Sequence, residues 1–281
     1  MREINVSLIT EAIVELCVAA NCELGEDVRE AVRRAAREEE SPQGREMLES
    51  MDENSAYAAE NGIAVCQDTG TVVVFAEVGQ DVHLVGGGFE EAINRGVAKG
   101  YTEGYLRCSM VRDPLKDRTN TDDNTPAVIY TTLVPGDKLR LMVAPKGFGS
   151  ENMSSLIMLT PAATDETVIR AVTDAVERAG SNPCPPVCIG VGIGGTADKA
   201  AQMAKHALTR RLDGQHTDPY YADIERRIVE RVNALGIGPQ GLGGTVTALS
   251  CAIETYPTHI AGLPLAVCIG CHVNRHREAV I

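Results

Sequence analysis

Aromatic side chains are scarce in this sequence. There is no tryptophan, there are only three phenylalanines among 281 residues, and aromatic residues make up 4% of the chain. Apolar residues nevertheless account for 44% of it, so a core has to be built from valine, isoleucine, leucine and alanine. An aliphatic core of this kind favours an α/β protein over an aromatic-rich β-sandwich.

Basic residues are also in short supply. The chain has 26 lysines and arginines against 39 aspartates and glutamates, which gives a formal net charge of −13. The resulting field repels nucleic acids and anionic membranes, so we expect neither as a partner. A small anionic substrate would have to be held by local arginines or backbone N–H groups.

Several familiar segments are missing. No apolar run reaches the roughly 18 residues of a membrane span, and the N-terminal segment has neither a basic leader nor a small-residue cleavage site. We therefore expect a cytoplasmic protein. The Walker A, HExxH and GxSxG motifs are absent as well. The nine cysteines are an odd number in a chain without a secretion signal, which leaves metal ligation, catalysis or burial as their roles.

The apolar periodicity predicts an α/β fold in which mixed β-sheets are flanked by helices, behind a helical N-terminal region of about residues 1–60. Ser41 followed by Pro42 marks a helix start in that region. We expect one domain over residues 1–281, with a subdomain boundary near residue 150. Strands are predicted at 63–66, 71–78, 187–193 and 264–269, with an antiparallel hairpin over 127–134 and 138–145; helices are predicted at 89–106, 165–180, 196–208 and 221–235.

Gly190, Gly192 and Gly195 spell the pattern of a dinucleotide-binding loop. Two features oppose that interpretation: the glycines lie largely inside an apolar run, and no second strand ending in Asp or Glu follows about twenty residues on. An NAD-binding dehydrogenase therefore ranks last among the hypotheses. Tight packing of a strand against the following helix explains the glycines better.

Sequence context divides the cysteines. Cys108, at the end of a predicted helix, is ambiguous. Three cysteines, by contrast, lie in polar or rigid loops: Cys66 closes a predicted strand before Gln-Asp-Thr-Gly, Cys184 is flanked by prolines, and Cys271 follows the last predicted strand. The remaining five lie in helical or apolar surroundings, where a free cysteine usually acts as a small hydrophobic residue: Cys17, Cys22, Cys188, Cys251 and Cys268.

The three loop cysteines are too widely spaced for a zinc ribbon, whose ligands come in close pairs. They could hold an iron-sulfur cluster, with purely structural cysteines as the competing interpretation. Three ligands would leave one iron of a cubane open, and an open metal position can act as a Lewis acid on a substrate hydroxyl or carboxylate. Such a cluster would serve a hydro-lyase rather than electron transfer.

Seven segments follow one another along the chain: CQDTG at 66–70, LRCS with Arg107, KGFGSEN at 146–152, NPCPP at 182–186, GVGIGGTADKAA at 190–201, GIGPQGLGG at 236–244, and Cys271 with Arg275 and His276. In this order they resemble the class I fumarate hydratases and the related L(+)-tartrate dehydratases. The resemblance covers most of the chain from about residue 40 onward.

The resemblance implies a 4Fe-4S cluster on Cys66, Cys184 and Cys271, and leaves Cys188 and Cys268 as core residues. It also implies the reversible hydration of fumarate to (S)-malate, a reaction of the tricarboxylic acid cycle. The close alternative is an L(+)-tartrate dehydratase, which forms oxaloacetate from tartrate.

The resemblance also assigns roles around the substrate. Gln67 would bind a carboxylate, Asp68 would contact the substrate and take part in proton transfer, and Arg107 would clamp a carboxylate through its planar guanidinium. Backbone N–H groups around Gly147 and Gly149 would bind the same anion. The residue between these two glycines is a phenylalanine, where the family frequently has a third glycine.

Single-chain members of the family continue into a second domain that supplies further substrate contacts and the other acid-base group. This sequence stops shortly after the third cysteine, so we expect an α subunit that is inactive without a separate β subunit and works as a dimer of α-β protomers. A non-catalytic iron-sulfur sensor is a more distant alternative, because it would leave Gln67, Asp68 and Arg107 without a task.

Overall fold

The computed structural model describes all 281 residues, and the chain forms two compact units. The first unit comprises Met1–Leu24, Ser55–Phe148 and Arg275–Ile281, and the second comprises Gly25–Asn54 and Gly149–Asn274. None of the helices combines the length and the apolarity that crossing a membrane requires. The mixture of helices and mixed sheets confirms the predicted α/β class.

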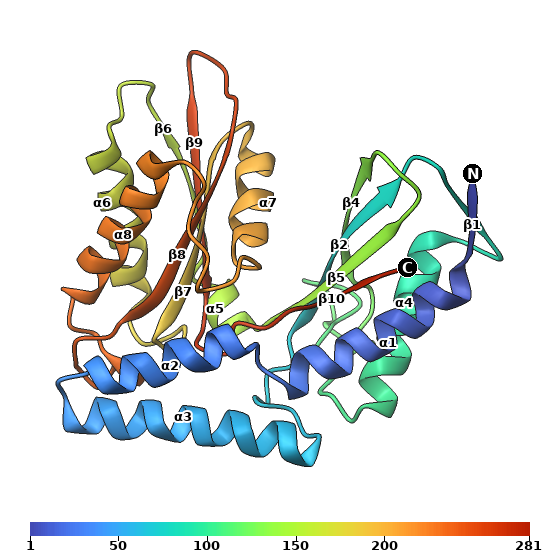
Figure 1. Ribbon diagram of the computed structural model, residues 1–281, viewed down its shortest axis with the longest axis horizontal. Helices are drawn as coiled ribbons and strands as arrows, with labels where there is room; N and C mark the ends of the chain where they lie inside the picture. The colour runs from blue at the N-terminus through green and yellow to red at the C-terminus, as the bar shows by residue number, and fades with distance from the viewer. The chain divides into compact units, whose positions relative to one another are not determined.

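The first unit is built around a four-stranded sheet with the strand order β10-β5-β2-β4. Helices α1 and α4 pack side by side on it, and α1 contacts β5 and β10 (Figure 1). Its elements are β1 (Arg2–Asn5), α1 (Val6–Cys22), β2 (Thr71–Gly79), β3 (Val82–Val85), α4 (Phe89–Glu103), β4 (Val128–Val134), β5 (Leu139–Lys146) and β10 (Arg277–Val280). Their shared core is aliphatic and includes Ile9, Ile13, Val97 and Leu141.

The second unit is a sheet with the order β6-β9-β7-β8, covered by α6 and α8 on one face and by α7 on the other (Figure 1). Its elements are α2 (Glu26–Glu38), β6 (Ser155–Leu159), α6 (Asp165–Ala179), β7 (Val187–Gly194), α7 (Ala197–Ala207), α8 (Pro219–Asn233), the 3-10 turn Pro239–Gly241, β8 (Ala248–Tyr256) and β9 (Leu263–Gly270). Helix α3 (Pro42–Asn61) passes from the second unit into the first, and the short helix α5 (Phe148–Glu151) begins at the last residue of the first unit's middle segment.

Most predicted helices are confirmed, together with the local signals that start and end them. The N–H of Gly44 donates to the hydroxyl of Ser41 at 3.2 Å, which caps α3 as expected. Thr164 caps α6 through the N–H of Thr167, and Gly180 ends that helix with a positive φ of 55°.

Two strand predictions are wrong. Residues 127–134 and 138–145 do not form a hairpin, because β2 lies between β4 and β5 and pairs with both, parallel to β4 and antiparallel to β5. Strand β2 takes this central place because Val72, Val74 and their neighbours are apolar on both faces and buried. Five strands were not predicted: β1, β3, β6, β8 and β10.

The predicted strand at 63–66 is also absent, and this segment is a loop between α3 and β2. The reason is the hydrogen bonding of this segment. The N–H of Val65 donates to the carbonyl of Asn21 at 3.0 Å, and Asn21 belongs to helix α1 rather than to a strand. Cys66 therefore precedes a strand instead of closing one.

The glycines of β7 serve close packing, as the sequence predicted. A β-carbon on Gly190 would collide with the carbonyl oxygen of Ala204, and one on Gly192 with the carbonyl oxygen of Ala200. Both carbonyls belong to α7, so the missing side chains let this helix lie directly on the strand. Helix α7, rather than a nucleotide, fills the space beside these glycines.

Candidate functional site

The loop of residues 66–70 is fixed through its backbone. Three consecutive carbonyl groups in it each accept a hydrogen bond from a buried side chain. The pairs are Arg275 to Asp68, Tyr101 to Thr69 at 2.6 Å and Asn124 to Gly70 at 3.0 Å. Burial raises the pKa of Tyr101, which keeps the hydroxyl a neutral donor. These three hydrogen bonds hold the backbone of the Cys-Gln-Asp-Thr-Gly loop in one conformation.

The carboxylate of Asp68 is oriented by two backbone N–H groups. Its Oδ1 accepts from Gly70 at 3.1 Å, and its Oδ2 accepts from Phe148 at 2.9 Å, so the contact joins residues eighty positions apart. A β-carbon on Gly147 would lie only 2.9 Å from Oδ2. Each carboxylate oxygen has further acceptor capacity, which suits a group that receives and returns a proton.

Three other predicted residues lie in the same unit. The side chain of Gln67 is exposed, and its Oε1 is 3.4 Å from the sulfur of the half-buried Cys66. Arg107 is exposed, and its carbonyl accepts a 2.9 Å hydrogen bond from the hydroxyl of Thr69. Its guanidinium makes no hydrogen bond or ion pair with the protein. The structure therefore places a fixed carboxylate and an available arginine on adjoining backbone segments.

In the second unit, the residue that follows Cys271 contacts the backbone of Cys184. Nδ1 of His272, the neighbour of Cys271, lies 3.0 Å from the carbonyl oxygen of Cys184. Cys184 is exposed and adopts a φ of +54°, a left-handed conformation that is uncommon for residues other than glycine. Strained backbone of this kind concentrates at functional sites. Gly149 is also in this unit, exposed, with the carbonyl of Asn182 as the only neighbour its missing β-carbon would touch.

The nine cysteines differ in burial. Cys188 and Cys268 are 1% and 4% exposed and pack against α7. Burial raises the pKa of Cys188 to about 12, and it likewise raises the pKa of Cys251. Because the thiolate is the form that binds metal, such buried thiols are poor ligands. Cys66, Cys184 and Cys271 are half-buried or exposed, and Cys108 is half-buried as well.

Comparison with known protein families identifies the family of this chain. A family model described as fumarate hydratase (Fumerase) matches residues 10–280. The chain belongs to this fumarate hydratase family. It is accordingly a hydro-lyase.

Relatives support the family over almost the whole chain. A protein of Methanocaldococcus jannaschii whose provisional name is L(+)-tartrate dehydratase subunit alpha is 38% identical over 276 residues, which are 95% of each chain. The L(+)-tartrate dehydratase subunit alpha of Escherichia coli K12 is 28% identical over 278 residues, covering 98% of this chain and 91% of its own.

The chemistry of the predicted ligand set fits an iron-sulfur cluster, which takes cysteine thiols as ligands. No three His, Cys, Asp or Glu side chains form a group that could hold one metal ion. Cys66 belongs to the first unit, and Cys184 and Cys271 belong to the second.

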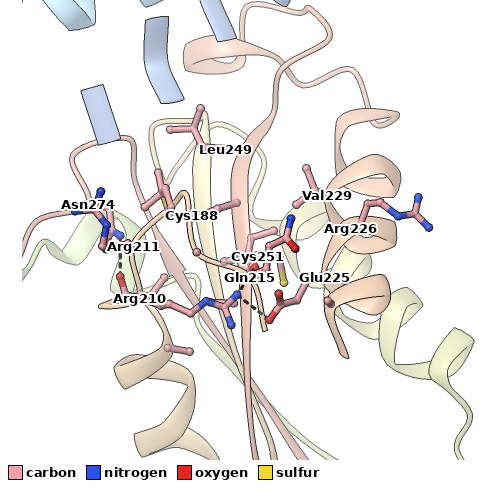
Figure 2. Close-up of a pocket in the computed structure, with 18 of the residues that line it drawn as sticks. Cys188, Arg210, Arg211, Gln215, Glu225, Arg226, Val229, Leu249, Cys251 and Asn274 are labelled. Atoms are coloured by element: carbon pink, nitrogen blue, oxygen red, sulfur yellow. Dashed lines mark hydrogen bonds and ion pairs between the residues drawn. The ribbon is translucent and has the colours of Figure 1, made fainter. Parts of the chain in front are cut away.

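The second unit contains a cavity of about 530 Å³ (Figure 2). Cys188 lines it, but none of the predicted ligands or substrate-binding residues does. Four arginines line it, and three of them pair with carboxylates. The pairs are Arg210 with Glu225 at 2.8 Å, Arg211 with Asp213 at 2.7 Å and Arg226 with Glu230 at 2.6 Å. The positive charges of these three arginines are therefore already neutralised and are not available to an anionic ligand.

The sequence interpretation assigned no site role to three residues that contact the 66–70 loop: Tyr101, Asn124 and Arg275. Their contacts with the 66–70 loop span 32, 54 and 207 positions, too far apart for any local pattern to indicate. The only sequence signal was the Arg275-His276 pair within the segments that resemble the family.

Proposed function

We propose that this chain is the α subunit of a two-subunit hydro-lyase that interconverts fumarate and (S)-malate. The observation that carries the proposal is the Asp68 carboxylate, which two backbone N–H groups hold in the Cys-Gln-Asp-Thr-Gly loop of a fumarate hydratase family member. Removing water from malate requires a base positioned at a weakly acidic C–H, and a fixed carboxylate is suited to that task.

Cys66, Cys184 and Cys271 are the proposed ligands of a 4Fe-4S cluster. Their exposure and loop positions support this choice over the buried Cys188 and Cys268. When bound, the cluster would supply an iron that acts as a Lewis acid on the substrate hydroxyl and an adjacent carboxylate.

The chain's own residues would bind and orient the dicarboxylate. The free guanidinium of Arg107 is suited to clamp one carboxylate, with Gln67 as a second polar contact. The backbone N–H groups around Gly147 and Gly149 are proposed donors to the same anion. The N–H of the intervening Phe148 serves a different purpose, since it donates to Asp68. Asp68 would then hold or return the proton at its carboxylate oxygens.

The partner is proposed from the names of the relatives. Both are called subunit alpha, and this chain covers at least 91% of their lengths, which supports a separate β subunit with the remaining acid-base group. In this proposal residues 1–281 act as one α-subunit domain, the working enzyme is a dimer of α-β protomers, and it acts in the cytoplasm.

Dehydration of L(+)-tartrate to oxaloacetate is the second candidate, and the names of the relatives favour it. The two reactions use the same cluster chemistry and differ in how the substrate's second hydroxyl is accommodated. The fumarate assignment instead follows the description of the family model.

One experiment tests these alternatives. The α chain is expressed with its β subunit, purified without oxygen, and assayed with fumarate, (S)-malate and L(+)-tartrate, with the α chain alone as the control. We expect turnover of fumarate and malate by the pair and none by the α chain. Turnover of tartrate alone would move the assignment to the second candidate. An intact cluster without turnover of any substrate would favour a sensor.

A further inference from the structure

Three charged side chains are buried in this fold: Glu39, Glu225 and Arg275, with exposures of 0%, 6% and 6%. The first two have partners for their charge. Glu39 accepts hydrogen bonds from several backbone N–H groups, among them Val246 at 2.8 Å. Glu225 pairs with Arg210 at 2.8 Å. Compensation of this kind is the rule for buried charges.

Arg275 lacks that compensation. Its Nη2 donates to the carbonyl oxygen of Asp68. Its Nε and Nη1 are buried and have no hydrogen-bond partner, and no carboxylate forms an ion pair with it. A buried charge without a counter-charge is strongly unfavourable, and buried donors without partners are rare enough in native proteins to require an explanation.

The surroundings of Arg275 do not supply an anion from the protein. The carboxylate of Asp68, the residue it touches, is directed to the N–H groups of Gly70 and Phe148. Nor is Arg275 the only support of the loop, because Tyr101 and Asn124 hold the next two carbonyls. A structural role alone therefore does not account for a cation with two unused donors.

We propose that Arg275 is an anion-binding residue of the catalytic site, whose free N–H groups complete their hydrogen bonding on a negatively charged ligand beside Asp68. The inference rests on the proposed function for the identity of that ligand. The required chemistry is an anionic acceptor, and it has two sources: a carboxylate of the substrate or a sulfide of the anionic cluster. Hydrogen bonds from a guanidinium to such groups are charge-assisted and strong.

The test uses the anaerobic α-β holoenzyme with Arg275→Gln and Arg275→Lys. Glutamine can still donate to the Asp68 carbonyl but removes the charge, and lysine keeps the charge if the glutamine variant does not fold. The matched controls are Arg277→Gln and Arg277→Lys, since Arg277 lies two residues further on and pairs with Glu23 at 3.4 Å. Isothermal titration with succinate measures dicarboxylate binding without turnover, and iron content and the electron paramagnetic resonance spectrum of the reduced cluster report on the metal site.

If the ligand is a substrate carboxylate, succinate binding weakens about tenfold or more in the Arg275 variants, while iron content matches that of the controls. If it is a cluster sulfide, the spectrum of the reduced cluster shifts and succinate binding is retained. Arg275 variants that match the Arg277 controls in both measurements overturn the inference. Because neither readout needs turnover, a wild-type enzyme inactive on fumarate and tartrate would refute the proposed function without deciding this question.

Discussion

Gly147 lies against the carboxylate of Asp68, so close that a β-carbon at this position would be 2.9 Å from Oδ2. Asp68 also accepts the N–H of the next residue, Phe148, at 2.9 Å. The backbone of residues 146–149 therefore supports the candidate catalytic carboxylate. The close contact explains on steric grounds why position 147 is a glycine. This explanation is independent of the backbone N–H group predicted to bind substrate.

Replacing Gly147 with alanine should displace Asp68 and lower kcat. A small misplacement of a catalytic group can lower the reaction rate about a hundredfold. We expect kcat to fall about tenfold to a hundredfold. Steady-state kinetics of the α-β enzyme measure it. Gly262→Ala is the control, because a β-carbon there meets nothing within 4 Å. Equal kcat in the two variants would show that the Asp68 position is not sensitive to this contact.

Serine substitutions should separate the cluster ligands from the buried cysteines. After anaerobic reconstitution the wild type should hold about four irons per chain. Cys66→Ser, Cys184→Ser and Cys271→Ser should lose the cluster, whereas Cys188→Ser and Cys268→Ser should keep it because those thiols pack against α7. Iron and sulfide analysis with visible absorption makes the measurement. Loss of the cluster in Cys188→Ser alone would refute the ligand set.

Glu39 should make stability depend on pH. Burial acts to raise the pKa of its carboxyl, but hydrogen bonds from the N–H groups of Ser41, Thr245 and Val246 outweigh burial and hold the pKa below its ordinary value. A lowered folded-state pKa adds stability above the unfolded value of about 4.3, and that stability is lost as pH falls through the folded pKa.

Glu39→Gln should therefore destabilise the protein at neutral pH, by about 1–3 kcal/mol, and the difference from wild type should shrink in acid. Thermal unfolding followed by circular dichroism at several pH values measures this effect. The control is Glu38→Gln, since Glu38 is the exposed last residue of α2 and directly precedes Glu39. A pH-independent difference between Glu39→Gln and wild type would contradict the prediction.

Gly192→Ala should destabilise the second unit. Its β-carbon would collide with the carbonyl of Ala200, and forcing extra volume into a packed contact typically costs about 1–3 kcal/mol. The melting temperature measures the loss, against Gly262→Ala as before. An unchanged melting temperature would mean that β7 and α7 can move apart without loss of stability. In a fluorescence titration, neither the wild type nor the variant should bind NADH.

How far the sequence predicts the fold depends on the range of the interaction. Local signals were sufficient for most helices: Ser41, for example, starts a helix where the capping rules predict. Strand pairing was predicted less well, because the order β10-β5-β2-β4 depends on contacts between distant segments. The loop containing Cys66 was misread as a strand for the same reason, since its backbone partner is Asn21 in a helix.

The sequence by itself determined the α/β class, the family motifs and the candidate ligands Cys66, Cys184 and Cys271, because composition, periodicity and short motifs are written in neighbouring residues. Only the tertiary structure decided which groups surround Asp68. It brought Phe148 to the carboxylate and Arg275 to the backbone of this residue across 80 and 207 positions. A buried, uncompensated charge such as that of Arg275 is a property of packing, and no run of adjacent residues carries it.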